Sequence, residues 1–183
     1  MANSKPEDHV LVPRGFAPTL TTERLTLRHL RAADHKPYAR MLASPDFMRF
    51  LGPARPVGEA WLRTLAMSGM WSVQGHGLFA VEYEGRFVGN VVLGDFQRTI
   101  EPSMRGVEAA WVFDESVWGR GIASEAVAAM LGWSDRNGVG LISCVISPEN
   151  APSLKLAARA GFEKVGEREL DGPVVYLERP AAA

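Results

Sequence analysis

Short stretches of alternating or continuous apolar residues recur along the chain and predict strands. The alternation at Arg24–Arg28 has the period of two that is typical of a strand with one buried face. Two further stretches flank the dipeptide Glu84-Gly85, and two strands joined by such a pair indicate a hairpin. The strands predicted in this way are Arg24–Arg28, Gly77–Tyr83, Arg86–Leu93, Val107–Phe113, Leu141–Ile146, Phe162–Leu170 and Val174–Glu178.

Other stretches carry apolar residues at the spacing of a helix. The clearest is Gly121–Arg136, whose apolar stripe ends at Asn137-Gly138, a pair that commonly terminates helices. The remaining predicted helices are Ala33–Ala43, Pro56–Met70 and Asn150–Ala160. Strands and helices alternate irregularly, and one helix links two neighbouring strands late in the chain. This order predicts an α+β fold.

Composition and charge narrow the class of protein. Hydrophobic residues make up 46% of the 183 residues and charged residues 22%, a profile typical of a soluble globular domain. With 20 Lys and Arg against 21 Asp and Glu, the net charge is −1, which argues against a general nucleic-acid or membrane-surface binder. No apolar run has the length of a membrane span, and the first residues are polar. We therefore expect a cytoplasmic protein with a flexible segment at 1–20 and one domain at 21–180.

Cysteine and histidine offer no metal site or disulfide framework. Cys144 is the lone cysteine, and it lies in an apolar predicted strand, where a buried and inert thiol is expected. The four histidines are scattered through the first half of the chain, without the spacing of a zinc ligand set. We expect no metal. Dimers are the commonest assembly of soluble proteins, so a homodimer is one expected arrangement, and the sequence leaves the oligomeric state open.

A glycine-containing turn carries the strongest chemical signal. In Trp118-Gly119-Arg120-Gly121-Ile122-Ala123-Ser124 the chain leaves a predicted strand and enters a helix. Gly119 and Gly121 let backbone N–H groups approach an anion closely, the helix start adds unpaired donors, and Arg120 can add a charge. The same glycines also suit a plain tight turn.

Two familiar nucleotide loops fit this turn poorly. A Walker loop needs Gly-Lys-Ser/Thr, which is absent. A dinucleotide loop needs a third glycine where Ser124 stands, and an acid at a strand end roughly 20 residues further on. Asp135 lies near that distance but inside the predicted helix. A nicotinamide-dependent oxidoreductase is therefore a weak hypothesis.

Several segments together resemble the GNAT superfamily of acyl-CoA-dependent N-acetyltransferases, and most closely its RimJ/RimL-like branch. The similarity extends from about Arg24 to Glu178. It rests on the quoted turn and on the motifs Thr22-Glu23-Arg24-Leu25-Thr26-Leu27-Arg28, Val88-Gly89-Asn90-Val91, Glu108-Ala109-Ala110-Trp111, Asn150-Ala151-Pro152-Ser153 and Ala160-Gly161-Phe162. The resemblance implies one domain with a central mixed, mostly antiparallel twisted sheet of about seven strands, flanked by helices, whose splayed strands form the acyl-CoA cleft.

The resemblance also assigns contacts with acetyl-CoA. Backbone N–H groups of Gly119, Gly121, Ile122, Ala123 and Ser124 would hold the diphosphate, with Trp118 and Arg120 beside them. The strand Trp111, Val112 and Phe113 would pair with the pantetheine. Family members often have Gln or Arg at the first position of the loop, whereas this chain has Trp118, which puts one side-chain contact in doubt.

Glu108 and Ser153 are the candidate catalytic residues. Glu108 interrupts an apolar strand, where burial would make its carboxylate a stronger base. It also stands near the start of that strand, where a solvent-exposed Glu without a catalytic role is equally expected from the residues alone. The resemblance implies that it accepts the amine proton through water, and that Ser153 protonates the departing thiolate. Many members use a tyrosine as the acid, but Ala157 holds that place here. Asn150 is a natural helix N-cap, and the resemblance makes it a coenzyme contact too. A backbone N–H near Val112 would be the oxyanion donor.

The expected activity is transfer of an acetyl group from acetyl-CoA to a primary amine, in a ternary complex without a covalent enzyme intermediate. The acceptor is either the α-amine of a protein N-terminus or a small-molecule amine, and the sequence does not choose between them. A non-catalytic acyl-CoA-binding module is the alternative, because the tyrosine acid is missing.

Overall fold

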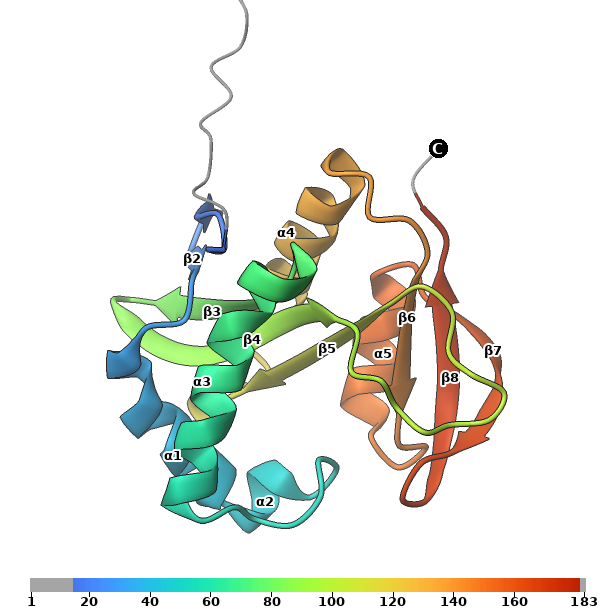
Figure 1. Ribbon diagram of the computed structural model, residues 1–183, viewed down its shortest axis with the longest axis horizontal. Coiled ribbons are helices and arrows are strands. Elements are labelled where there is room, and N and C mark those ends of the chain that lie inside the picture. The colour runs from blue at the N-terminus through green and yellow to red at the C-terminus, as the bar shows by residue number, and fades with distance from the viewer. Residues whose placement is uncertain (1–14, 182–183) are drawn as a thin grey trace, which may run out of the picture.

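Eight strands form one sheet in the computed structural model, which describes residues 15–181 (Figure 1). The strand order is β1-β2-β3-β4-β5-β6-β8-β7, and only β5 and β6 run parallel. The bounds of the strands are β1 Leu20–Thr21, β2 Leu25–Arg28, β3 Leu78–Tyr83, β4 Arg86–Gly94, β5 Val107–Phe113, β6 Ile142–Ile146, β7 Glu163–Glu169 and β8 Pro173–Arg179. The predicted α+β fold with a mixed, mostly antiparallel sheet is confirmed.

Helices cover both faces of the sheet. They are α1 His35–Ala43, α2 Pro45–Met48, α3 Val57–Gln74, α4 Ile122–Arg136 and α5 Ala151–Arg159, with single 3₁₀ turns at Ala32–Asp34 and Glu115–Val117. Neighbouring residues of one strand face opposite sides, so Val92 packs in a cluster with Met70 of α3, whereas Val91 packs in a cluster with Met130 of α4. Figure 1 shows α3 crossing in front of the central strands. The strands β3 and β4 are buried on both faces, which explains their nearly continuous apolar sequence.

Local signals fix several boundaries as predicted. The hairpin between β3 and β4 turns at Glu84 and Gly85, whose φ angles of 49° and 71° are those of the tight turn that matches strand twist. Helix α4 ends at Asn137 with Gly138 in the left-handed region at φ 68°. The prediction of these two features from turn residues is confirmed.

Three features differ from the prediction by more than one or two residues. The sheet has one strand beyond the seven predicted from the sequence, β1, whose two residues are too few for a periodic pattern. The four-residue helix α2 was not predicted; it begins where the Ser44 hydroxyl accepts a hydrogen bond from the Phe47 N–H. Helix α3 continues past Met70 to Gln74, where Gly75 at φ 74° ends it.

The predicted flexible segment 1–20 lies outside the described residues as far as residue 14. From residue 15 the chain packs on the domain. Ala17 is 7% exposed, its N–H donates to His29 Nδ1 at 3.1 Å, and β1 begins at Leu20. The packed part of the chain therefore begins before residue 21.

Candidate active site

The strands β5 and β6 separate soon after they meet. They pair in register only at Val107 with Ile142 and Glu108 with Ser143. On its other side, β5 pairs with β4 from Glu108 to Phe113, which is all of the strand but its first residue. The remaining residues of β5 therefore have one edge without a strand partner among residues 15–181, which is the splayed arrangement that the resemblance implied.

Strand register decides which backbone groups face this open edge. The Asp114 N–H donates to the Val88 carbonyl at 2.9 Å, and hydrogen-bonded pairs alternate along an antiparallel ladder. The N–H of Val112 is thus directed toward Asn90 on β4, whereas those of Trp111 and Phe113 face the opening. The backbone N–H groups of Trp111 and Phe113 are therefore better candidates than that of Val112 for the expected oxyanion donor.

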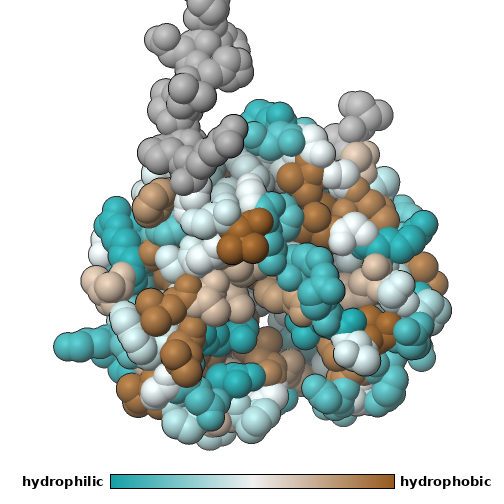
Figure 2. All heavy atoms as spheres, in the orientation of Figure 1, coloured by the Kyte–Doolittle hydropathy of each residue, from teal (hydrophilic) through white to brown (hydrophobic). Residues whose placement is uncertain are grey.

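A cavity of about 750 Å³ lies on the open side of β5. Its walls come from α1–α3, from β4, β5 and β6, from the start of α5 and from the turn between β7 and β8. Figure 2 shows this face hollowed between the part carrying α1–α3 and the part carrying β6–β8. Five of the predicted site residues line the cavity: Glu108, Trp111, Val112, Asn150 and Ser153.

Glu108 is a buried carboxylate with a charged partner. Its side chain is 7% exposed, and both oxygens accept hydrogen bonds from Arg98, from Nε and Nη2, at 2.7 Å each. The bonds with Glu108 raise the pKa of Arg98. The guanidinium offsets the desolvation of the carboxylate. The sequence did not predict Arg98, because it lies in the irregular β4–β5 loop, where no periodicity places a side chain.

Two buried polar groups on the strands that flank β5 lack hydrogen-bond partners among the described residues. Ser143 lies beside Glu108 in the parallel register, and its Oγ is unpaired. Asn90 is 3% exposed, pairs with Val112 across the β4–β5 ladder and lines the cavity, and its Nδ2 is unpaired. Buried polar groups are nearly always satisfied by protein, water or ligand. Both groups are therefore candidates to bind water or substrate.

The start of α5 brings Ser153 against β5. The Ser153 N–H donates to Asn150 Oδ1 at 3.2 Å, so Asn150 is the N-cap of the helix, as its sequence position suggested. The Ser153 Oγ accepts a hydrogen bond from the Trp111 indole Nε1 at 3.3 Å. The hydroxyl is thereby fixed beside the open edge of β5, on the same cavity as Glu108.

The glycine turn lies beyond the cavity, at the other end of β5. Gly119 and Gly121 have φ angles of 72° and 78°, which strain any residue with a Cβ, and Gly121 is the N-cap of α4. A Cβ at Gly119 would meet nothing within 4 Å, so the backbone there is open to approach. The first N–H groups of α4, including those of Ile122, Ala123 and Ser124, have no acceptor within the helix. The turn can therefore bind an anion.

Side chains hold this turn in place. Arg24 donates to the Arg120 carbonyl at 3.0 Å and pairs with Glu125 at 2.7 Å. The Arg120 guanidinium lies over the Tyr83 ring and donates to its hydroxyl at 2.8 Å. The Trp118 indole donates to the Phe113 carbonyl at 2.8 Å, which joins the turn to the end of β5. Arg120 thus has a protein partner in this structure, which the sequence did not predict.

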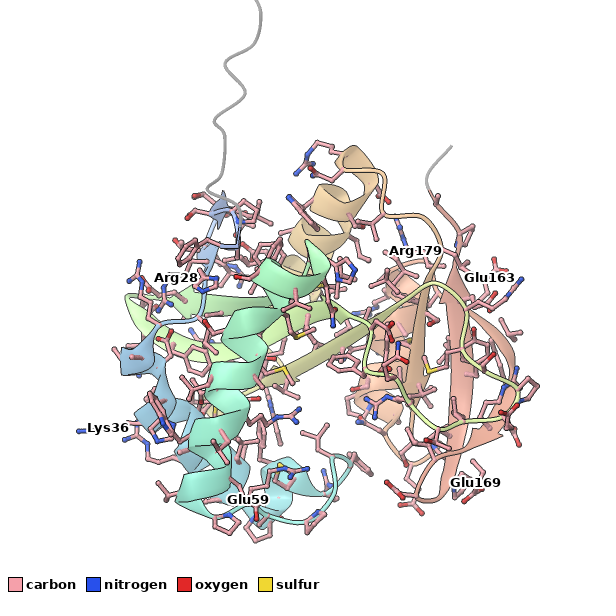
Figure 3. The ribbon with its side chains drawn as sticks, in the orientation of Figure 1. Arg28, Lys36, Glu59, Glu163, Glu169 and Arg179 are labelled. Atoms are coloured by element: carbon pink, nitrogen blue, oxygen red, sulfur yellow. The ribbon has the colours of Figure 1, made fainter. Side chains whose placement is uncertain are left out.

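Two other side chains considered from the sequence, a thiol and a carboxylate, are buried or paired in the structure. Burial raises the pKa of the Cys144 thiol to about 12, so it stays protonated. Asp135, the acid considered for a dinucleotide site, lies within α4 and pairs at 2.7 Å with Arg179, which Figure 3 shows on β8.

Across residues 15–181 no cluster of three His, Cys, Asp or Glu side chains is placed to bind a metal. No described helix is long and apolar enough to cross a bilayer.

Comparison with known proteins gives a consistent match. Residues 24–163 match the GNAT acetyltransferase domain family. The uncharacterized N-acetyltransferase p20 of Bacillus licheniformis is 27% identical over 155 residues, covering 81% of this chain and 84% of that protein.

Two solved structures of acetyltransferases have the same fold as this chain. One is a protein of Bordetella pertussis described as a GNAT-family acetyltransferase. It is 30% identical with a TM-score of 0.78, and the match covers 89% of this chain and 99% of that protein. The ribosomal-protein-S5-alanine acetyltransferase of Vibrio fischeri shares the fold at 19% identity, with a TM-score of 0.70 and coverage of 90% and 97%.

Proposed function

Because this chain belongs to the GNAT acetyltransferase family, we propose that it transfers the acetyl group of acetyl-CoA directly to a primary amine in a ternary complex. The observation that carries the proposal is the joint position of Glu108 and Ser153. A buried carboxylate and a fixed hydroxyl line one cavity beside a strand edge that no other strand covers.

The coenzyme fits along β5. The N–H groups of Gly119, Gly121, Ile122, Ala123 and Ser124 would bind its diphosphate, because the left-handed glycines leave the turn open and the helix start favours negative charge. The open edge at Trp111 and Phe113 would pair with the pantetheine amides, with Val112 between them. Trp118, Arg120 and Asn150 would border the coenzyme. Acetyl-CoA supplies the thioester carbonyl that the amine attacks.

Three groups of the protein then act on the reacting atoms. Glu108 takes the proton of the ammonium group through water, which frees the nitrogen lone pair. The N–H of Trp111 or Phe113 donates to the carbonyl oxygen as negative charge develops there. The C–N bond forms, the C–S bond breaks, and Ser153 returns a proton to the thiolate. Since a thiol has an ordinary pKa of about 8.5, this last step contributes least.

A non-catalytic acyl-CoA-binding module is the alternative function. It is favoured by Ala157, which occupies the place of the tyrosine acid and is completely buried in the core. Such a module would bind acetyl-CoA but would transfer its acetyl group to no amine, so that no CoA would be released.

Release of CoA and mass spectrometry of the amine products test the proposal. With an amine panel of amino acids, amino-acid amides, spermidine and short peptides, wild type should form N-acetyl products. Glu108→Gln should lower kcat by about 10²–10⁴-fold with an unchanged acetyl-CoA Kd, and Ser153→Ala should lower it by about tenfold or less. Glu178→Gln is the matched control, because Glu178 is a buried strand carboxylate paired with Arg105 outside the cavity. Equal kcat in Glu108→Gln and wild type would remove Glu108 from the mechanism.

A further inference from the structure

The cavity wall formed by α2, α3 and the loop between them carries three arginines, Arg49, Arg55 and Arg63. The Arg63 Nε donates to the Tyr38 hydroxyl at 3.2 Å, which is a neutral partner. The Arg49 guanidinium lies 4.8 Å from the centre of the Phe50 ring. Only Arg55 has a carboxylate, that of Glu59 at 3.5 Å on the exposed surface. Among the described residues, Arg49 and Arg63 therefore face this cavity without an acidic partner.

The acidic residues of the cavity lie on other walls. Glu108 comes from β5, Glu149 from the segment before α5, and Asp171 from the turn between β7 and β8. Arg98 also lines these walls, but it pairs with the Glu108 carboxylate, and the charge of Asp171 attracts it as well. Positive charge without an acidic partner is thus concentrated on one wall, and carboxylates are concentrated on the others.

A second observation adds a buried donor to the same cavity. The Asn90 Nδ2 is inaccessible to solvent and has no hydrogen-bond acceptor within the described chain. Asn90 lines the cavity from β4, where it pairs with Val112, four residues along β5 from Glu108. Guanidinium groups without a carboxylate partner and an unpaired amide donor are the groups that bind carboxylate, phosphate and similar oxyanions.

This segregation of charge specifies the acceptor. We propose that the acceptor is a primary amine that also carries a carboxylate or another anionic group, with its nitrogen at Glu108 and its anionic group at Arg49 and Arg63. The inference rests on the proposed amine transfer and adds the class of substrate. Acceptors with several positive charges and no anionic group, such as polyamines, would meet repulsion from the same two arginines. A free amino acid and an acidic peptide share the required chemistry.

Pairs of amines that differ only in a carboxylate or its neutral amide isolate the effect of the anionic group on the rate. The probes are glycine and glycinamide, β-alanine and β-alaninamide, and the peptides Asp-Ala-Ala-amide and Asn-Ala-Ala-amide. Rates are compared at equal concentrations of unprotonated amine, because a neighbouring carboxylate raises the pKa of the amine. The wild-type protein should favour the anionic member in kcat/KM by at least about tenfold. The small-molecule pairs and the peptide pair show which source of the amine is used.

Variants connect this preference to the arginines. Arg49→Gln and Arg63→Gln should each lower the anionic-to-neutral ratio several-fold, mainly by raising KM for the anionic member. Arg63→Lys keeps the charge and should restore most of the ratio, which distinguishes charge from packing. Arg159→Gln is the matched control, because Arg159 is exposed at the end of α5 and does not line the cavity.

The outcomes separate this inference from the proposed function. Equal or better acetylation of the neutral members would overturn the inference and leave amine transfer intact. If no amine is acetylated, calorimetric titration of the CoA-saturated protein with the anionic probes decides. Binding that weakens in Arg63→Gln would support the anionic site and refute the transfer, whereas no binding would overturn the inference.

Discussion

Replacing Arg98 with glutamine would leave a buried carboxylate without its partner. In the wild type, Arg98 makes two 2.7 Å hydrogen bonds to Glu108, whose side chain is 7% exposed, while that of Arg98 is 34% exposed. Breaking a fully buried pair costs about 3–5 kcal/mol, and solvent around Arg98 reduces this to about 2–3 kcal/mol. For a chain of this size, Tm should fall by roughly 4–12 °C.

The rate of turnover separates a role at the site from a purely structural one. Arg98 holds both oxygens of the Glu108 carboxylate, so Arg98→Gln should lower kcat/KM by about tenfold or more in protein that is still folded. Arg105→Gln is the control: Arg105 lies in the same loop and pairs with buried Glu178 outside the cavity. It should lose stability with an unchanged kcat/KM. An unchanged kcat/KM in folded Arg98→Gln, or an equal loss in both variants, would contradict a role of Arg98 at the site.

Other expected outcomes concern the turn, the buried thiol and acid stability. Gly121→Ala puts a Cβ on a residue at φ 78° and should weaken acetyl-CoA binding about tenfold in calorimetry. Gly138→Ala is the control, because Gly138 has a φ of 68° but lies at the far end of α4, and it should leave binding unchanged. Equal losses of affinity in the two variants would contradict a role of the turn in binding. Cys144, its pKa raised by burial to about 12, should resist iodoacetamide at pH 8 until urea unfolds the chain, and native labelling would refute its burial. The hydrogen bond from Arg105 lowers the pKa of Glu178 below its ordinary 4.5, so this stabilisation is complete above about pH 4.5 and is lost as the pH falls. Between pH 6 and pH 3 the urea midpoint should therefore fall more for wild type than for Glu178→Gln, and parallel curves would contradict this.

Most of the fold could be predicted from local signals. The hairpin at Glu84-Gly85 and the end of α4 at Asn137-Gly138 depend on residue types with special backbone angles, and such residues are visible in sequence. The strand β1 and the helix α2 could not be predicted, because two and four residues are too few to show a period. The tertiary contacts of the domain, more than their own sequences, stabilise these short elements.

The candidate site was predicted in outline and incompletely. The N-cap role of Asn150 follows from local sequence, and the structure confirms it. For Glu108 the local sequence left burial and an exposed strand start both open, and the structure shows the residue buried. The ion pair of Glu108 with Arg98 and the contact of Trp111 with Ser153 join segments that no periodicity relates. The resemblance placed Phe47–Gly52 and the region around Trp61 at the acceptor groove, but the sequence did not show that Arg49 and Arg63 line the cavity without a carboxylate partner, because only folding sets those contacts.

A calorimetric titration with acetyl-CoA, with CoA and NAD as comparisons, tests the central claim most directly. We expect one site per chain for acetyl-CoA, a similar site for CoA, and no binding of NAD. Absence of heat with both coenzymes, or equal binding of NAD, would reduce the turn at Gly119–Ser124 to a plain structural turn and contradict the proposed function.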